Sequence, residues 1–190
     1  MDTDGLIHAG SGLDQVTWMD VRVGDWVATP RHGKPVEINA LWYNALCTMD
    51  MLQAKFGDND DSYRQLASLV KTSFNKRFWN ENTGCLYDVV DEDDDTIRPN
   101  QIYAVSLPFT MLDKEREKAI VDTVMDKLYV GCGLRSLDPD PQGLPSDLHW
   151  LSLKARPRLS SGNSLGLSAR WFYQCLCKGK RPHEGDRFMR

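Results

Sequence analysis

The sequence predicts an all-α chain in which consecutive helices pack as antiparallel hairpins. Two observations support this fold class: apolar residues recur at helical spacing in successive segments, and short polar turns join those segments. The alternation of apolar and polar residues that indicates strands is weak throughout the chain. The expected helices cover residues 35–56, 60–78, 100–112 and 113–128.

The first thirty residues are rich in Gly, Asp and Trp and follow neither the helical nor the strand period, which predicts a long ordered loop. Pro35 is suited to the first turn of a helix, and Gly57 is suited to end it. The apolar positions that repeat between them are Ile38, Leu41, Trp42, Ala45, Met49, Leu52 and Phe56.

A second helix is expected to begin at the acidic pair Asp60–Asp61. Its apolar face consists of Leu66, Leu69, Val70, Phe74 and Phe78. Residues 80–84 have the composition of a turn, and the acidic run 91–95 follows them.

That acidic run is interpreted as a solvated loop. A calcium site is the alternative, but the run lacks the glycine and the terminal Glu of an EF-hand loop. Asn100 and Asp113 are expected to cap the last two helices.

The bulk composition is that of an ordinary globular protein: 190 residues, of which 41% are hydrophobic and 26% charged. Neither a secretory signal nor a run of about eighteen apolar residues is present, which predicts a soluble cytoplasmic protein without a membrane partner. The five cysteines are odd in number and scattered, so we expect reduced thiols, no bound metal and no cofactor.

The charge is unevenly distributed. Residues 1–140 have a net charge of −10 and residues 141–190 one of +6, against −4 for the whole chain. The chain is therefore divided into a body, 1–140, and a tail, 141–190. The acidic body argues against a nucleic-acid partner, because such proteins need a basic surface. The sequence does not predict an oligomeric state.

Aromatic and charged residues are interleaved near the N-terminus, as a sugar site requires. Aromatic rings cover the flat C–H faces of a pyranose, charged groups bind its hydroxyls, and hydrolysis needs two carboxyl groups. A packed loop under charged side chains is the alternative. The residues are Trp18, Trp26, Trp42 and Tyr43 with Asp20, Asp25, Arg31, Lys34 and Glu37.

The order of these residues is more specific than their composition. The string Thr17-Trp18-Met19-Asp20 stands among longer strings that resemble the C-terminal glucosidase domain of glycogen-debranching enzymes, the amylo-α-1,6-glucosidases. The resemblance extends over about residues 4–140. Its strings are 4–10, 15–20, 24–31, 33–44, 82–88, 97–101 and 133–139.

The resemblance implies an (α/α)6 barrel, of which this chain holds about four of twelve helices. It also implies hydrolysis of α-1,6-linked glucose from an α-glucan, glycogen or limit dextrin, with inversion. In this family's pattern Asp20 is the general acid, whereas its alternative role is a helix cap or a loop ion pair. Apolar faces left without neighbouring helices favour instability or association.

The resemblance also proposes substrate-binding residues. Ring contacts are implied for the four aromatic residues, although Trp42 is equally suited to a helix core. Contacts with sugar hydroxyls, or support of the pocket, are implied for a polar set. That set is Asp25, Arg31, Lys34, Glu37, Asn39, Arg98, Asn100 and Gln101.

The tail departs from the family. The family continues with Tyr-His-Gln-Gly-Thr-Val-Trp beside the second catalytic carboxylate, and codons for residues 159–165 read one nucleotide later permit that string. We therefore expect a frameshift between Asp138 and Gln142. The pair Cys175 and Cys177 and the basic run 178–181 are accordingly assigned no chemistry.

Because the general base belongs to the replaced segment, the chain is predicted not to hydrolyse glucan. Asp147, the acid that the tail offers before His183, matches no motif of the family. The alternatives are a non-catalytic glucan-binding or scaffold remnant, and another (α/α)6 hydrolase such as a glucoamylase-like enzyme.

Overall fold

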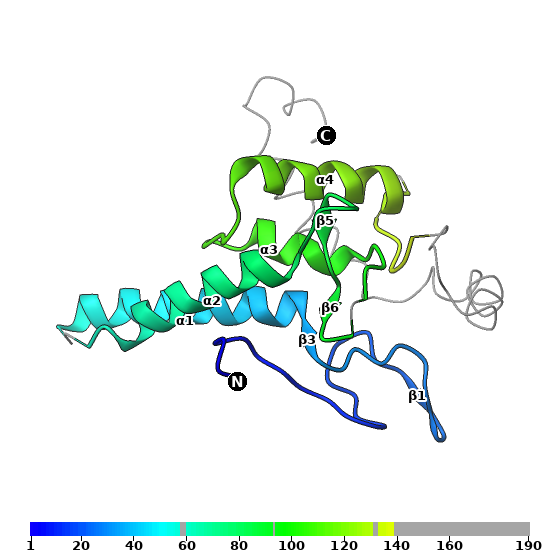
Figure 1. The fold of residues 1–190 in the computed structure, drawn as a ribbon, viewed down its shortest axis with the longest axis horizontal. Helices are drawn as coiled ribbons and strands as arrows, with labels where there is room; N and C mark the ends of the chain where they lie inside the picture. The colour runs from blue at the N-terminus through cyan, green and yellow to red at the C-terminus, as the bar shows by residue number, and fades with distance from the viewer. Residues whose placement is uncertain (58–59, 93, 131–132, 139–190) are drawn as a thin grey trace, which may run out of the picture.

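The computed structural model describes residues 1–57, 60–92, 94–130 and 133–138, and Figure 1 shows how its elements are arranged. Helices make up most of the regular secondary structure of the described part, which agrees with the all-α prediction in part, but short strands of two residues each are also present. Strands of that length leave no alternating pattern in a sequence. They are β1 (Arg22–Val23), β2 (Trp26–Val27), β3 (Lys34–Pro35), β4 (Trp79–Asn80), β5 (Cys85–Leu86) and β6 (Val89–Val90).

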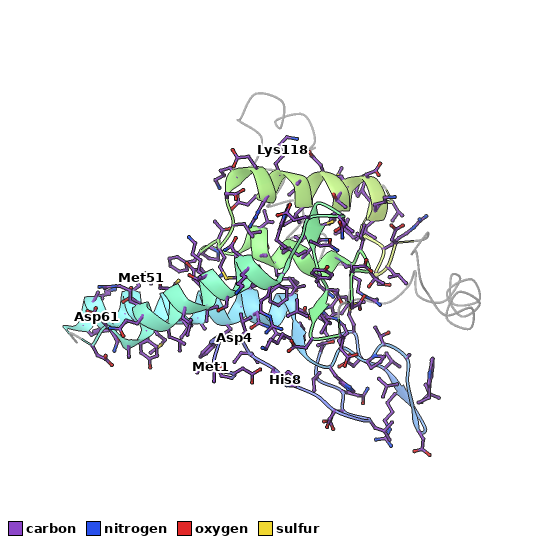
Figure 2. All side chains as sticks on the ribbon, viewed as in Figure 1. Met1, Asp4, His8, Met51, Asp61 and Lys118 are labelled. Carbon is purple, nitrogen blue, oxygen red and sulfur yellow. The ribbon has the colours of Figure 1, made fainter. Side chains whose placement is uncertain are left out.

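The two longest helices form a hairpin. α1 (Val36–Phe56) begins directly after Pro35 and ends at Gly57, which has the left-handed backbone conformation (φ 81°) that favours glycine. α2 (Ser62–Arg77) packs beside it in the opposite direction, and Figure 2 shows Asp61 at the end of the hairpin that is remote from α4. The first predicted helix pair is therefore confirmed.

The buried side of α1 differs from the apolar stripe expected from the sequence. Val36, Ala40 and Leu46 are buried, whereas Leu41 is 43% exposed and Phe56 is 78% exposed. α1 has apolar residues on more than one side, so its periodicity identifies the helix without identifying the face that packs.

The expected helix over 100–112 is wrong in extent. A 3-10 turn, η1 (Pro99–Ile102), leads into a short helix, α3 (Tyr103–Ser106). The helix stops there because Pro108 forces the preceding residue, Leu107, into an extended conformation (ψ 155°). Asn100 does not cap this segment, since it lies inside η1.

The last helix, α4 (Lys114–Leu128), agrees with the prediction. The Asp113 side chain accepts a hydrogen bond of 2.8 Å from the Arg116 amide and so caps the helix as expected. α4 packs against η1 and β5, and α3 packs against α1 and η1, so the second predicted pair does not form as a simple hairpin.

The short strands connect the N-terminal loop to the helices. β3, at the start of α1, pairs with β6 in an antiparallel arrangement, and Ala9 forms a bridge to Gly33 just before β3. β1 and β2 form a separate hairpin farther along the loop (Figure 1). The Ala9–Gly33 bridge and the β3–β6 pair thereby hold the two ends of the loop that contains Trp18 and Asp20 close to the start of α1.

In the described ranges, no helix combines the length and the apolar composition needed to cross a membrane. Cys47 and Cys85 are free thiols. The tail 141–190, with Asp147, Cys175 and Cys177, lies outside the described residues, as do Cys132 and the expected frameshift position after Asp138.

Candidate active site

Asp20, the expected general acid, is fixed by its own loop. Its Oδ2 atom accepts hydrogen bonds from the backbone amides of Val16 (2.6 Å) and Thr17 (2.7 Å), and its Oδ1 atom accepts one of 3.2 Å from the Thr17 hydroxyl. The side chain of Gln15 donates to the Asp20 carbonyl. Asp20 is 8% exposed, and its carboxylate is held against the backbone of its own turn.

Trp18 connects this turn to η1. Its indole Nε1–H donates to Oδ1 of Asn100 at 3.0 Å, and Nδ2 of Asn100 donates to Oδ1 of Asp88 at 2.8 Å. Asn100 and Asp88 are buried, while Trp18 is 48% exposed. The indole is therefore anchored by its polar edge, and part of its ring remains open to solvent.

A buried ion cluster lies behind that connection. Arg31 has no exposed surface; its guanidinium binds both carboxylate oxygens of Glu37 and donates from Nε to Oδ2 of Asp88 at 2.6 Å. Arg98 approaches the same Asp88 oxygen at 3.4 Å. Two acids and two arginines thus neutralise one another inside the protein.

Burial dominates the chemistry of Asp88. Loss of hydration raises the pKa of this carboxyl to about 6, although Arg31 and Arg98 act to lower it and Glu37 adds repulsion. The pKa of Arg31 is raised, because its hydrogen bonds to Glu37 and the attraction of both acids outweigh the effect of burial. The Asp88 carboxyl is therefore mainly ionised at neutral pH and becomes protonated as the pH falls through about 6.

A second ion cluster surrounds Lys34 in β3. Two of its acids come from the N-terminal segment, which runs below the α1–α2 hairpin where Figure 2 labels Asp4. Lys34 Nζ lies 2.9 Å from Asp4 and 3.0 Å from Asp2. Arg77, at the end of α2, binds Asp4 at 2.7 Å and also contacts Asp91. Burial alone would raise the pKa of Asp4, but the hydrogen bonds from Lys34 and Arg77 prevail and lower it to about 2.

Several predicted contact residues hold the polypeptide itself. The amide of Asn39 forms two hydrogen bonds with the backbone of Ile7 (2.7 and 3.1 Å), and the indole of Trp42 donates to the Gly5 carbonyl at 3.1 Å. Gln101 accepts a bond from the Leu86 amide. These contacts join the N-terminal segment to α1, and β5 to η1.

Tyr43 is 9% exposed in α1, and burial raises its pKa to about 12. The two predicted residues on the β1–β2 hairpin are different, because they face solvent. Trp26 is 45% exposed, and the Asp25 side chain is 97% exposed beside Arg22. Trp18, Asp25 and Trp26 are thus the predicted contact residues whose surfaces are most open to a ligand.

Sequence reasoning missed Asp88, which joins the Trp18–Asn100 hydrogen bond to the buried cluster of Arg31 and Glu37. It lies in the string 82–88 that carries the family resemblance, but it was not singled out. An acidic residue that directly precedes an apolar pair, Val89–Val90, was the available signal. Among the described residues, no His, Cys, Asp or Glu side chains group in a way that could hold a metal ion.

Comparison with protein families supplies the deciding observation. Residues 1–145, more than half of the chain, match the family described as amylo-alpha-1,6-glucosidase. The chain belongs to the amylo-alpha-1,6-glucosidase family. No match was found among the curated proteins. The matched range contains the Asp20 turn, the half-exposed Trp18 and both ion clusters.

Membership of the amylo-alpha-1,6-glucosidase family identifies this chain with a glycogen-debranching glycoside hydrolase domain and gives an α-glucan as the substrate class.

Proposed function

We propose that this chain carries an α-glucan site of an inverting α-1,6-glucosidase of cytoplasmic glycogen breakdown, built on part of an (α/α)6 barrel. The proposal depends on one observation. Within the matched range, a half-exposed indole, Trp18, stands two residues before a carboxylate, Asp20, whose orientation is fixed by two backbone amides. An anchored ring beside an oriented acid is the arrangement that glycoside cleavage needs.

The two oxygens of Asp20 have different tasks in this proposal. Oδ2 accepts two N–H bonds, so a proton on the carboxyl belongs on Oδ1, whose one bond is with the Thr17 hydroxyl. As general acid, Asp20 gives that proton to the glycosidic oxygen while the bond to the anomeric carbon breaks. Inversion also needs a base roughly 6.5 to 9.5 Å away, with a water between it and the sugar.

The remaining predicted residues divide by exposure. Trp26 and Asp25 are open to solvent and are proposed as sugar contacts together with Trp18. The buried set is proposed to support the pocket rather than to contact sugar. It consists of Arg31, Lys34, Glu37, Asn39, Tyr43, Asn100 and Gln101, with Trp42 and Arg98 less fully buried beside them.

A second candidate, glucan binding without turnover, is favoured by the burial of Asp20. A carboxylate that is 8% exposed and accepts three hydrogen bonds from its own loop reaches a bound sugar only if the turn opens. The family match favours both candidates over a glucoamylase-like activity. We accordingly propose that the chain of 190 residues binds glucan and does not hydrolyse it.

Retention of the purified chain on glycogen, measured by electrophoresis in gels that contain increasing glycogen, tests the binding site. Trp18→Ala is expected to abolish retention. Phe56→Ala is the matched control, because it removes an aromatic ring that is 78% exposed at the far end of α1. Equal retention of the two variants would contradict a site at Trp18.

Release of glucose from a branched limit dextrin tests the chemistry. The unmodified chain is expected to release no more glucose than the Asp20→Asn variant, which keeps the shape of the side chain but cannot donate a carboxylic proton. Robust release that depends on Asp20 would show that a second carboxylate is present in this chain, and the binding-only proposal would be wrong.

A further inference from the structure

Asn100 lies between two partners that require opposite hydrogen-bonding roles of its amide group: Trp18 needs an acceptor and Asp88 needs a donor. The indole nitrogen of Trp18 can only donate a hydrogen bond, whereas an ionised carboxylate such as Asp88 can only accept. The oxygen of Asn100 therefore has to face Trp18, and its nitrogen has to face Asp88, as the distances of 3.0 and 2.8 Å show. The orientation of Asn100 is set by the protonation and chemical type of its neighbours.

Asp88 is held as an acceptor by the buried ion cluster. Its Oδ2 atom receives Arg31 at 2.6 Å and Arg98 at 3.4 Å, which leaves Oδ1 for Asn100. Arg31 in turn is held by both oxygens of Glu37 at the start of α1. Trp18 thus donates to Asn100, and Asn100 donates to Asp88. Asp88 also accepts from Arg31, which donates on its other side to Glu37 in α1.

We propose that Asp88 and Asn100 are positioning residues that fix the indole of Trp18 for sugar stacking. The inference rests on the proposed function, since it supposes that Trp18 is the ring of the glucan site. Both residues are buried, with 2% and 0% of their surfaces exposed, and therefore act through Trp18 instead of touching the glucan. Without the bond to Asn100, an indole that is 48% exposed has fewer contacts to hold its ring in one orientation.

The substitution Asp88→Asn reverses the direction of this hydrogen-bond chain while keeping the size of the side chain. The introduced amide turns its oxygen toward the two arginines, so its NH2 group faces Asn100. Asn100 then turns its own oxygen toward position 88, and its NH2 group meets the donor of Trp18. The Trp18 bond is lost.

Exchanging the two side chains restores it. In Asp88→Asn combined with Asn100→Asp, the amide at position 88 donates to the carboxylate at position 100, and that carboxylate also accepts the Trp18 indole. Net charge and side-chain size are unchanged. A residue pair that merely fills space would not be rescued by this exchange.

The readout is the indole N–H resonance of Trp18 in ¹H–¹⁵N spectra of the full chain, assigned with Trp18→Phe, together with its rate of hydrogen exchange. The Trp42 indole is the internal control, because it has a bond of its own to Gly5 and lies outside the chain of contacts. We expect Asp88→Asn to shift the Trp18 signal and speed its exchange at least tenfold. The exchanged double variant should return both toward wild type, with Trp42 unchanged throughout.

Glycogen retention measured on the same samples connects the geometry to binding. The expected loss for Asp88→Asn is roughly three- to tenfold, the change that one neutral hydrogen bond corresponds to, with recovery in the double variant. If Asp88→Asn does not fold, Asn100→Leu carries the test, because it removes the acceptor of the Trp18 indole and leaves Asp88 paired with Arg31 and Arg98: its Trp18 indole should lose protection while that of Trp42 does not.

An unchanged Trp18 signal in folded Asp88→Asn, or an unprotected one in the folded double variant, would overturn the positioning role. So would retention that does not follow the Trp18 signal among the variants. Failure of the proposed function looks different: wild type itself is not retained on glycogen, whatever its Trp18 signal shows.

Discussion

Replacing Arg31 with Met should be among the most damaging single substitutions in this chain. Met keeps the length of the side chain but removes the charge from a site with no exposed surface, where Arg31 donates to Glu37 at 2.7 Å and to Asp88 at 2.6 Å. Breaking a buried ion pair in this way costs about 3 to 5 kcal/mol, because the remaining charges stay buried without their partner. Arg98 remains near Asp88 at 3.4 Å, but no interaction of Arg98 with Glu37 replaces the lost pair among the described contacts.

Such a loss is a large part of the 5 to 15 kcal/mol that stabilises a typical domain. The free energy of unfolding is measured by urea denaturation at pH 7, followed by far-UV circular dichroism. Arg64→Met is the matched control, because the Arg64 side chain is 61% exposed and its pairs with Asp50 and Asp61 lie at the surface. The control should cost less than about 1 kcal/mol. Equal losses for the two variants would refute the reasoning that burial makes the Arg31 cluster decisive.

Three further predictions concern pH and backbone geometry. Asp4→Asn should lower the free energy of unfolding by about 1 to 2 kcal/mol at pH 7, because hydrogen bonds from Lys34 and Arg77 lower the pKa of Asp4 to about 2. This stability is present above about pH 4 and is lost as the pH falls toward 2. In urea titrations at acid pH, the variant and wild type should therefore converge. Lowering the pH through about 6 should protonate Asp88, which faces Arg31, Arg98 and Glu37, and turn its Oδ1 atom into a donor toward Asn100. The Trp18 indole signal should then titrate with a midpoint near 6 while the Trp42 signal does not. A Trp18 signal that does not change with pH would contradict the assignment. Because burial raises this carboxyl's pKa, protonation also favours the folded state between about pH 6 and 4, opposite in sign to Asp4. Gly33→Ala should cost more than 1 kcal/mol in thermal or urea unfolding, since φ is 105° and the added Cβ would lie 2.7 Å from the Val90 carbonyl oxygen, whereas Gly12→Ala, with open space around it, should cost less.

The helices were predictable where local signals decide them. Pro35 and Gly57 bound α1 because each has a backbone preference that acts on its own, and Asp113 caps α4 through a bond to an amide three residues on. The shortened helix at Ser106 was equally local, since Pro108 excludes a helical conformation one residue earlier. Pro108 therefore predicts the end of this helix better than the apolar periodicity of residues 100–112 does.

The site was less predictable, because its geometry depends on contacts across many residues. Trp18 and Asn100 are 82 positions apart, and Arg31 and Asp88 are 57 apart, so no spacing rule brings them together. The resemblance identified most of the polar residues in this region, but it gave no indication that Arg31 and Asn100 are fully buried. Asp88 was missed because its importance comes from the partners of its side chain, Arg31, Arg98 and Asn100, and not from its neighbours in the sequence.

The most direct test of the α-glucan site is a titration of the full chain with a branched oligosaccharide that carries a single α-1,6-linked glucose. The Trp18 indole resonance is followed in ¹H–¹⁵N spectra, with the Trp42 indole as reference. A site at Trp18 and Asp20 predicts a saturable shift of the Trp18 signal, an unchanged Trp42 signal, and a weaker response to the unbranched α-1,4-linked oligosaccharide. A Trp18 signal that does not move at millimolar oligosaccharide would contradict the assignment of the glucan site to this turn.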